Sequence, residues 1–233
     1  MGLDVSARWE EALSLAATLD PDAYLLTGDF CAHDPEAATY RRLYPQLQAL
    51  QKPFFVVAGN HDDRGMLRQY LPDLPGKGQE PIYEVVQIND HSFILLDTSP
   101  GTIDAAQLDW LQRTLPTVPN AAIVMHHPPV PLGIHFMDNK YPLRDTDRLL
   151  AILRADGRRR RVFCGHYHNS GTVSHENLDV FLCPPTSFYL DAKADDFKQV
   201  NLRPGFLLLE WADNGDFRCI PYATSGPTDE LQN

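Results

Sequence analysis

The sequence predicts an α/β fold in which helices cover two stacked β-sheets within one domain. Most of the chain alternates helical apolar patterns with short apolar runs that are typical of buried strands. The last third is rich in strand patterns, and neither an internal repeat nor a low-complexity linker divides the chain. The 233 residues, 43% of them hydrophobic, are enough for one sizeable core. We expect the domain to span residues 1–223 and a polar tail to span 224–233.

Apolar spacing and proline positions define the elements of the N-terminal part. A helical pattern over residues 9–17 stops before Pro21, because the residue that precedes a proline disfavours the helical conformation. Asp34 and Pro35 fit the N-cap and first position of a second helix, which Pro45 is expected to break or kink. The other elements predicted here are strands over 24–26 and 54–57 and a helix near 66–71.

Strands dominate the pattern beyond residue 80. Apolar runs over 82–88 and 92–96 flank a three-residue turn and predict a hairpin. A second hairpin, over 206–211 and 217–220, surrounds Asp213-Asn214-Gly215. Helices are predicted around Leu108 and over 147–154, and single strands over 122–125, 161–164 and 180–183.

Charge and cysteine content narrow the classes of function. The net charge of −11 comes from 20 Lys and Arg against 31 Asp and Glu, so the surface repels nucleic acid polymers and anionic membranes. A phosphate-bearing substrate would need a local counter-field from a metal ion or oriented backbone N–H groups. The four cysteines show neither CxxC pairs nor disulfide spacing, and the sequence shows no signal peptide and no apolar span of about 18 residues. These features predict a reduced, cytoplasmic setting.

Four predicted strands run directly into residues that commonly bind metals. The carboxyl ends of strands in α/β sheets form ligand sites, so we expect the four segments to converge. A carboxylate, an amide oxygen and several imidazoles suit Mn, Fe or Zn, and a carboxylate can bridge two such ions about 3.5–4 Å apart. Phosphoester hydrolysis is the natural reaction of such a pair. The segments are Gly28-Asp29, Gly59-Asn60-His61-Asp62, His126-His127-Pro128-Pro129 and Gly165-His166-Tyr167-His168.

These four ordered segments resemble the motifs of calcineurin-like metallophosphoesterases, and in particular of their class III 3',5'-cyclic-nucleotide phosphodiesterase branch. The resemblance covers nearly the whole chain and includes residues 184–187 and 203–206. It implies a four-layer α/β/β/α sandwich of two mixed β-sheets flanked by helices. It also implies two divalent or mixed-valence metal ions and a small phosphodiester as substrate, with a metal-bridging hydroxide that attacks phosphorus.

The resemblance also implies a role for each matching residue. Asp29 would bridge the two ions, and His61 would be the catalytic residue beside the scissile phosphate, where it stabilises charge or helps to protonate the leaving alkoxide. His127 and Asp62 would support the metal ligands. His135 is considered on its position alone: it follows the His-Pro-Pro loop and either lies on the surface or lines the substrate pocket. Asn60, His126 and His166 would complete one metal site, and His168 would belong to the other.

One part of the family pattern has no counterpart in the sequence. The family's first strand ends in Asp-x-His, which supplies two ligands to the metal site of His168, and no Asp-x-His occurs in this chain. The chain is therefore expected to lack that strand, either through a truncated start or through a true loss of the first metal. Only Asp29 and His168 remain for that site, so a single metal ion is an alternative to two. The loss would leave unpaired strand edges, which a partner chain, for example in a homodimer, would cover.

The leading hypothesis is a metal-dependent phosphodiesterase that acts on cyclic AMP. Two alternatives stay open: hydrolysis of glycerophosphodiesters or other small diesters, and a metal-poor scaffold that binds a partner without catalysis. The basic run 158–161 is either a solvated turn or a phosphate or partner contact. Phe136, Phe188 and Tyr189 either stack on a substrate base or pack in the protein interior.

Overall fold

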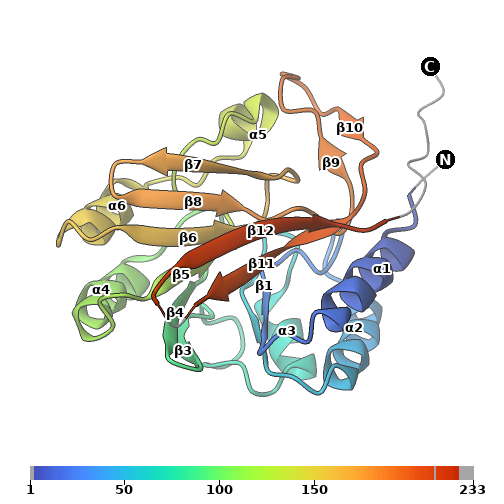
Figure 1. The fold of residues 1–233 in the computed structure, drawn as a ribbon, viewed down its shortest axis with the longest axis horizontal. Helices are drawn as coiled ribbons and strands as arrows, with labels where there is room; N and C mark the ends of the chain where they lie inside the picture. The colour runs from blue at the N-terminus through green and yellow to red at the C-terminus, as the bar shows by residue number, and fades with distance from the viewer. Residues whose placement is uncertain (1–2, 213, 226–233) are drawn as a thin grey trace.

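Six strands form the central mixed sheet of the computed structural model, which describes residues 3–212 and 214–225 (Figure 1). Four neighbouring strands run parallel, and an antiparallel strand lies at each edge. The five strands expected for this sheet are confirmed, whereas the sixth, over 171–175, was not expected. In spatial order the strands are β3 (Glu84–Ile88), β4 (His91–Leu96), β5 (Ala122–Met125), β6 (Arg160–Cys164), β8 (Leu178–Leu182) and β7 (Gly171–His175).

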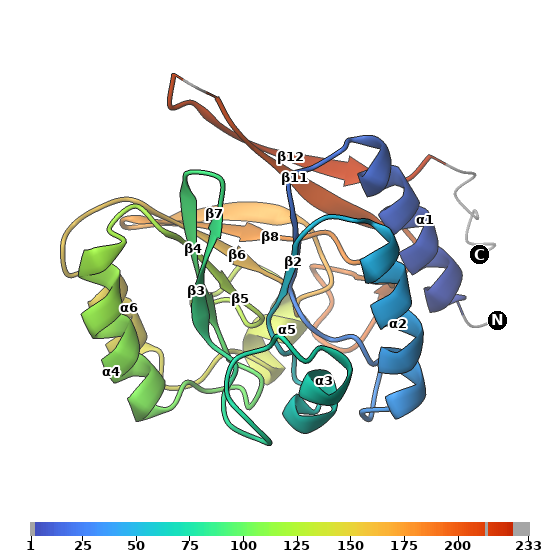
Figure 2. The same cartoon turned by 90° about the horizontal axis from the view of Figure 1, so that it is seen from below.

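The two faces of this sheet are covered by different kinds of element (Figure 2). Helices α4 (Ala105–Thr114) and α6 (Asp147–Arg154) pack on one face, and the short helix η1 (Leu115–Thr117) follows α4. Buried side chains alternate along β5, so that Ile123 faces these helices and Val124 faces the opposite layer. This alternation gives the sheet an apolar surface on both sides, as expected for parallel strands buried in an α/β domain.

Two separate strand pairs cover the other face. β1 (Tyr24–Leu26) pairs in parallel with β2 (Phe54–Val56), and β11 (Gly205–Trp211) pairs antiparallel with β12 (Phe217–Ala223). Both pairs pack against the same apolar cluster of the central sheet. The second layer of the described chain is thus divided into two pairs, where one mixed sheet was expected. The missing first strand stays a prediction, and Asp213 of the predicted turn and residues 226–233 of the predicted tail lie outside the described residues.

Three helices complete the outermost layer: α1 (Val5–Thr18), α2 (Ala37–Ala49) and α3 (Arg64–Tyr70). The expected start of α2 is wrong, because its N-cap is Glu36 and not Asp34. The expected break at Pro45 is also wrong, since the helix runs through this residue. Buried residues on both sides of the proline, Tyr40, Leu43 and Leu47, hold the helix against the core and offset the lost hydrogen bond.

The chain also contains elements that the sequence pattern did not indicate. Helix α5 (His135–Lys140) and the pair β9 (Tyr189–Leu190) and β10 (Gln199–Val200) lie near the carboxyl ends of the central strands (Figure 1). They are too short to show a periodic apolar pattern. No helix among the described residues is long and apolar enough to cross a membrane.

Arg160, the first residue of β6, is bonded to neighbouring segments, and its replacement tests how much these contacts stabilise the fold. Its side chain is 2% exposed and donates to Leu153 O at 3.0 Å, Pro119 O at 3.0 Å and the Asp156 carboxylate at 2.6 Å. Arg160→Met should lower the free energy of unfolding by about 2–4 kcal/mol, because buried carbonyls lose a charged donor. Urea unfolding measures this change.

Arg159 provides the matched control for this prediction. It pairs with Asp179, but its side chain is 62% exposed to solvent. Arg159→Met should change the free energy of unfolding by less than about 1 kcal/mol. Equal losses in the two variants would contradict the structural role that we assign to Arg160.

Candidate metal centre

The four predicted ligand segments meet at the carboxyl ends of β1, β2, β5 and β6. The imidazole Nε2 of His126 lies 3.1 Å from Asp29 Oδ2 and 3.1 Å from Asn60 Oδ1. The His166 ring lies on the other side, with its centroid 4.9 Å from that of His126. Carboxylate, amide and imidazole donors from four separate loops therefore surround one small volume.

The backbone at this site is held in a conformation that side chains rarely adopt. Asp29, His166 and His168 have φ angles of 58°, 66° and 45°. A side chain at Gly28, whose φ is 90°, would place its Cβ 2.5 Å from the backbone nitrogen of Gly59. Strained residues cluster at sites where the surrounding structure fixes them, and here they aim side chains inward from sharp turns.

The hydrogen bonds of three histidines fix which ring nitrogen faces the site. Each imidazole donates one N–H to a backbone carbonyl, and this leaves the lone pair of its other nitrogen available for a metal ion. Metal-binding histidines nearly always have such a partner, because it sets the tautomer and the ring orientation. The pairs are His126 Nδ1 with Thr27 O at 2.6 Å, His166 Nε2 with Tyr141 O at 3.0 Å, and His168 Nδ1 with Phe188 O at 3.0 Å.

Asp62 lies behind the ligands and holds two of the loops together. Its carboxylate accepts hydrogen bonds from the backbone N–H of Asp29 at 2.8 Å and of Gly59 at 2.9 Å, and from the Tyr40 hydroxyl at 3.1 Å. Burial raises the pKa of Asp62 to about 6, against the lowering effect of the Gly59 N–H. The supporting role expected for Asp62 stays a prediction.

The charges inside the cluster suit a cation. Burial raises the pKa of Asp29, but the charge and hydrogen bond of His126 outweigh it and hold this pKa below its ordinary value. Burial, followed by the charge of His126, lowers the pKa of His166 to about 3, and burial lowers that of His168. Burial lowers the pKa of His126, but the charge and hydrogen bond of Asp29 outweigh it and raise this pKa above its ordinary value. Asp29, His166 and His168 are therefore in the protonation states that metal binding requires, and His126 would release its Nε2 proton to a bound cation.

His127 lies as close to the other histidines as the expected ligands do, although it was expected to orient them. Its ring centroid lies 4.0 Å from that of His166, and its Nδ1 lies 3.0 Å from Thr98 Oγ1. Within the described part of the chain, the ligand atoms of His126, His127 and His166 all lie within 4.8 Å of one another. The expectation that His127 orients the ligands stays a prediction.

Two further predicted residues lie at the edge of the cluster. His61 donates its backbone N–H to Asp29 Oδ1 at 2.9 Å, and its ring Nδ1 lies 2.7 Å from His33 O. His135 begins α5 and lies 3.4 Å from Asp195, and both of these side chains are exposed. His61 is thus joined directly to the ligand group, whereas His135 is placed on a neighbouring element.

Sequence reasoning missed the polar residues that support this centre. The Thr98 hydroxyl accepts the backbone N–H of His127 at 3.0 Å and lies 3.0 Å from Nδ1 of the same residue. Thr98 follows β4, a fifth strand whose carboxyl end is polar. This position after a predicted strand could have identified Thr98 from the sequence. The carbonyls of Thr27, Tyr141 and Phe188 gave no signal, because a backbone acceptor is independent of residue type.

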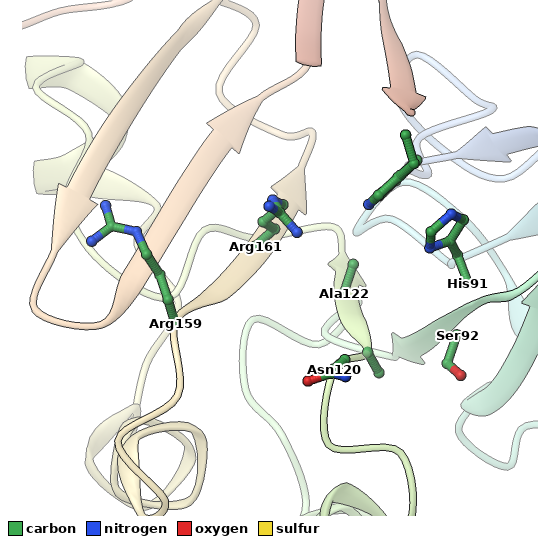
Figure 3. A pocket seen from close by; sticks show the side chains of 8 residues that line it. His91, Ser92, Asn120, Ala122, Arg159 and Arg161 are labelled. Carbon is green, nitrogen blue, oxygen red and sulfur yellow. The ribbon is translucent and has the colours of Figure 1, made fainter. Parts of the chain in front are cut away.

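A second polar pocket lies at the opposite ends of the strands (Figure 3). His91, the first residue of β4, and Arg161, the second residue of β6, face it, with Ala122 between them. The Arg161 guanidinium lies 4.1 Å from the centroid of the Phe217 ring, and Arg159 pairs with Asp179. Arg159 and Arg161, two residues of the basic run 158–161, are therefore both held by contacts within the protein. The pocket is separate from the metal centre.

Comparison with known proteins agrees with this geometry. Residues 4–170 match the calcineurin-like phosphoesterase family. The chain is 30% identical over 210 residues to the 3',5'-cyclic adenosine monophosphate phosphodiesterase CpdA of Vibrio vulnificus, with 87% of this chain and 74% of that protein covered. It is 31% identical over 178 residues to the glycerophosphodiester phosphodiesterase GpdQ of Enterobacter lignolyticus, with 71% and 63% covered.

A solved structure supports the fold. GAP50, the anchor in the inner membrane complex of Plasmodium, superposes with a TM-score of 0.65 at 14% sequence identity and covers 97% of this chain and 81% of its own. The α/β arrangement of mixed sheets and flanking helices is therefore shared, and the resemblance inferred from the four motifs is confirmed. This chain belongs to the calcineurin-like phosphoesterase family.

Proposed function

We propose that this chain hydrolyses small phosphodiesters, with 3',5'-cyclic nucleotides such as cyclic AMP as its substrates. The observation that carries the proposal is the orientation of the three histidines, each with one ring nitrogen bonded to a backbone carbonyl and the other left for a metal ion. A protein that used this fold only as a scaffold would have no physical need for this arrangement.

The residues fit a metal site of mixed oxygen and nitrogen donors. Asp29, Asn60, His126 and His166 would hold one ion, and four protein ligands are a complete set for a tightly bound ion. Asp29 and His168 would contribute to a second ion. When bound, divalent ions of the Mn, Fe or Zn type supply charge neutralisation for the phosphoryl oxygens and activate water.

The chain's own residues would position the substrate and manage protons. His61 is fixed by its backbone bond to Asp29 and by the His33 carbonyl, so its Nε2 is the ring atom left to meet the phosphodiester or the departing oxygen. His127, buried and bonded to Thr98, would keep the His166 ring in place. Asp62 would hold the turn that presents Asp29.

The choice of substrate draws on two relatives of similar identity. The Vibrio protein is named for cyclic AMP and the Enterobacter protein for glycerophosphodiesters. The match to the Vibrio protein extends over 87% of this chain, and that to the Enterobacter protein over 71%. This difference favours cyclic nucleotides, and glycerophosphodiesters remain the alternative.

An activity assay with defined metals tests the proposal. The purified chain, reconstituted with Mn²⁺, should hydrolyse cyclic AMP, and removal of the metal by a chelator should abolish the activity until Mn²⁺ is restored. Product formation is followed by chromatography. Absence of turnover on cyclic AMP, on a glycerophosphodiester and on an aryl phosphodiester with each of Mn²⁺, Fe²⁺ and Zn²⁺ would reject the enzyme and favour the scaffold.

A further inference from the structure

Four aromatic side chains beside the metal centre form a continuous surface, which we call the aromatic shelf: Phe136, Tyr141, Phe188 and Phe197. The ring centroid of Phe136 lies 5.4 Å from that of Tyr141 and 6.0 Å from that of Phe197. The Phe197 and Phe188 centroids are 5.9 Å apart. The rings therefore form a chain of neighbours, although they come from distant parts of the sequence. Phe136 and Tyr141 belong to α5 and the residue that follows it, Phe188 precedes β9, and Phe197 lies between β9 and β10.

Both ends of the shelf are attached to predicted metal ligands. The Phe188 ring centroid lies 4.4 Å from that of His168, and the Phe188 carbonyl accepts the hydrogen bond of that imidazole. At the other end, the Tyr141 carbonyl accepts from His166 Nε2 at 3.0 Å. The shelf thus borders the predicted ligands on the side of α5, where the Phe188 ring packs against the His168 ring.

Backbone contacts hold the elements of the shelf in place. The His135 backbone N–H, at the start of α5, donates to Ala192 O at 3.0 Å. Leu190 of β9 donates its backbone N–H to His168 O at 2.9 Å. Figure 1 shows α5 beside β9 and β10. The shelf is therefore formed before a ligand arrives, which lowers the entropic cost of binding.

Two of the four rings are unusually exposed. Tyr141 is 53% exposed and Phe197 is 58% exposed, whereas aromatic rings that serve only packing are mostly buried. Exposed aromatic surface next to a reactive centre is typical of a binding site for a flat apolar group. The carboxylates of Asp195 and Asp196, adjacent in sequence to Phe197, are exposed and disfavour a phosphate at that end. An uncharged ring meets no such repulsion.

We propose that the aromatic shelf binds the planar ring of a phosphodiester substrate, and so selects nucleobase-bearing diesters over glycerophosphodiesters. This inference rests on the proposed function and names the substrate class of the same site. Stacking on Phe197 and Tyr141 holds the base, while the phosphate lies at the ligands beyond Phe188. Because every base has a π-face, the shelf tolerates different nucleobases.

Kinetics on two substrates test the shelf. Phe197→Leu and Tyr141→Leu keep an apolar side chain but remove the ring. Each should lower kcat/KM for cyclic AMP about tenfold, mainly through KM, and should lower the ratio of kcat/KM for cyclic AMP to that for glycerophosphocholine by a similar factor. Leu202, which is 51% exposed and is not part of the shelf, supplies the matched control Leu202→Ala, expected to change neither rate. The inference would be overturned if neither ring variant lowered kcat/KM for cyclic AMP. It would also be overturned if kcat/KM fell equally for the two substrates.

A binding measurement separates failure of the shelf from failure of the proposed function. If the Mn²⁺-loaded protein hydrolyses no diester, the proposed function is wrong, and calorimetry with adenosine 5'-monophosphate and glycerol 3-phosphate then decides on the shelf. Tighter binding of the adenosine compound, reduced about tenfold in Phe197→Leu, supports the shelf. Equal affinity for the two compounds overturns it. Circular dichroism melting verifies that each variant is folded.

Discussion

Asp29→Asn is expected to lower kcat/KM for phosphodiester hydrolysis by about 10³-fold or more. The carboxylate lies 3.1 Å from the His126 imidazole, in the position that both metal ions would share. Its replacement by a neutral amide would remove the anionic donor that we propose for both ions. The charge stabilisation that bound metals give to a phosphoryl transition state amounts to several kcal/mol, and each 1.36 kcal/mol is tenfold in rate.

Asparagine is the informative replacement, because it preserves the local structure. Asp29 has a φ of 58°, a region in which asparagine is one of the few tolerated residues. The amide oxygen can still accept the His61 backbone N–H that now bonds to Asp29 Oδ1. Alanine would lose this hydrogen bond and add backbone strain, so its effect would mix chemistry with folding.

Steady-state kinetics with Mn²⁺ and cyclic AMP give the result, with Asp22→Asn as the control. Asp22 is an exposed aspartate that immediately precedes the same strand, and its replacement should leave the rate unchanged. A rate for Asp29→Asn within tenfold of the wild-type rate, in a folded protein, would remove Asp29 from the catalytic centre.

The apolar runs and the polar residues that follow them were sufficient to predict where the site lies. Residues 122–125 are buried throughout, so only a strand in the sheet interior fits them, and His126 must then emerge at its carboxyl end. A mostly buried strand also precedes His166, whereas the apolar strands before Asp29 and Asn60 are half-buried and end a few residues earlier. A short apolar strand fixes the position of the next residue closely, because the sheet leaves little freedom in register.

The sequence was less informative where tertiary contacts override local preference. Pro45 lies within a helix because buried neighbours on both sides hold it there, and propensity alone predicts a break. Helix α5 has six residues, too few for a periodic pattern, yet it places Tyr141 at the His166 ring. The supporting shell of the site therefore depends on packing that no local pattern describes.

The distribution of ligands predicts unequal metal affinities, which elemental analysis of Mn²⁺-loaded, desalted protein can measure. The wild-type chain should retain one ion, because one site has four protein donors and the other has only Asp29 and His168. His126→Asn should lose this ion, since the imidazole lies at the centre of the donor group. The ion should remain in His168→Asn. It should also remain in His127→Asn, where the affinity for Mn²⁺ should fall by no more than about 100-fold.

The variants also discriminate between the alternatives for the second metal. If His127→Asn lost the ion as completely as His126→Asn, His127 would be a ligand, which its position beside His166 permits. Retention of two ions in the wild-type protein, with one lost in His168→Asn, would mean that donors other than the described side chains complete the second site. Since two protein ligands hold an ion weakly, those donors would have to come from another segment or from a partner chain. A comparison of monomer and dimer fractions from gel filtration would then tell these two sources apart.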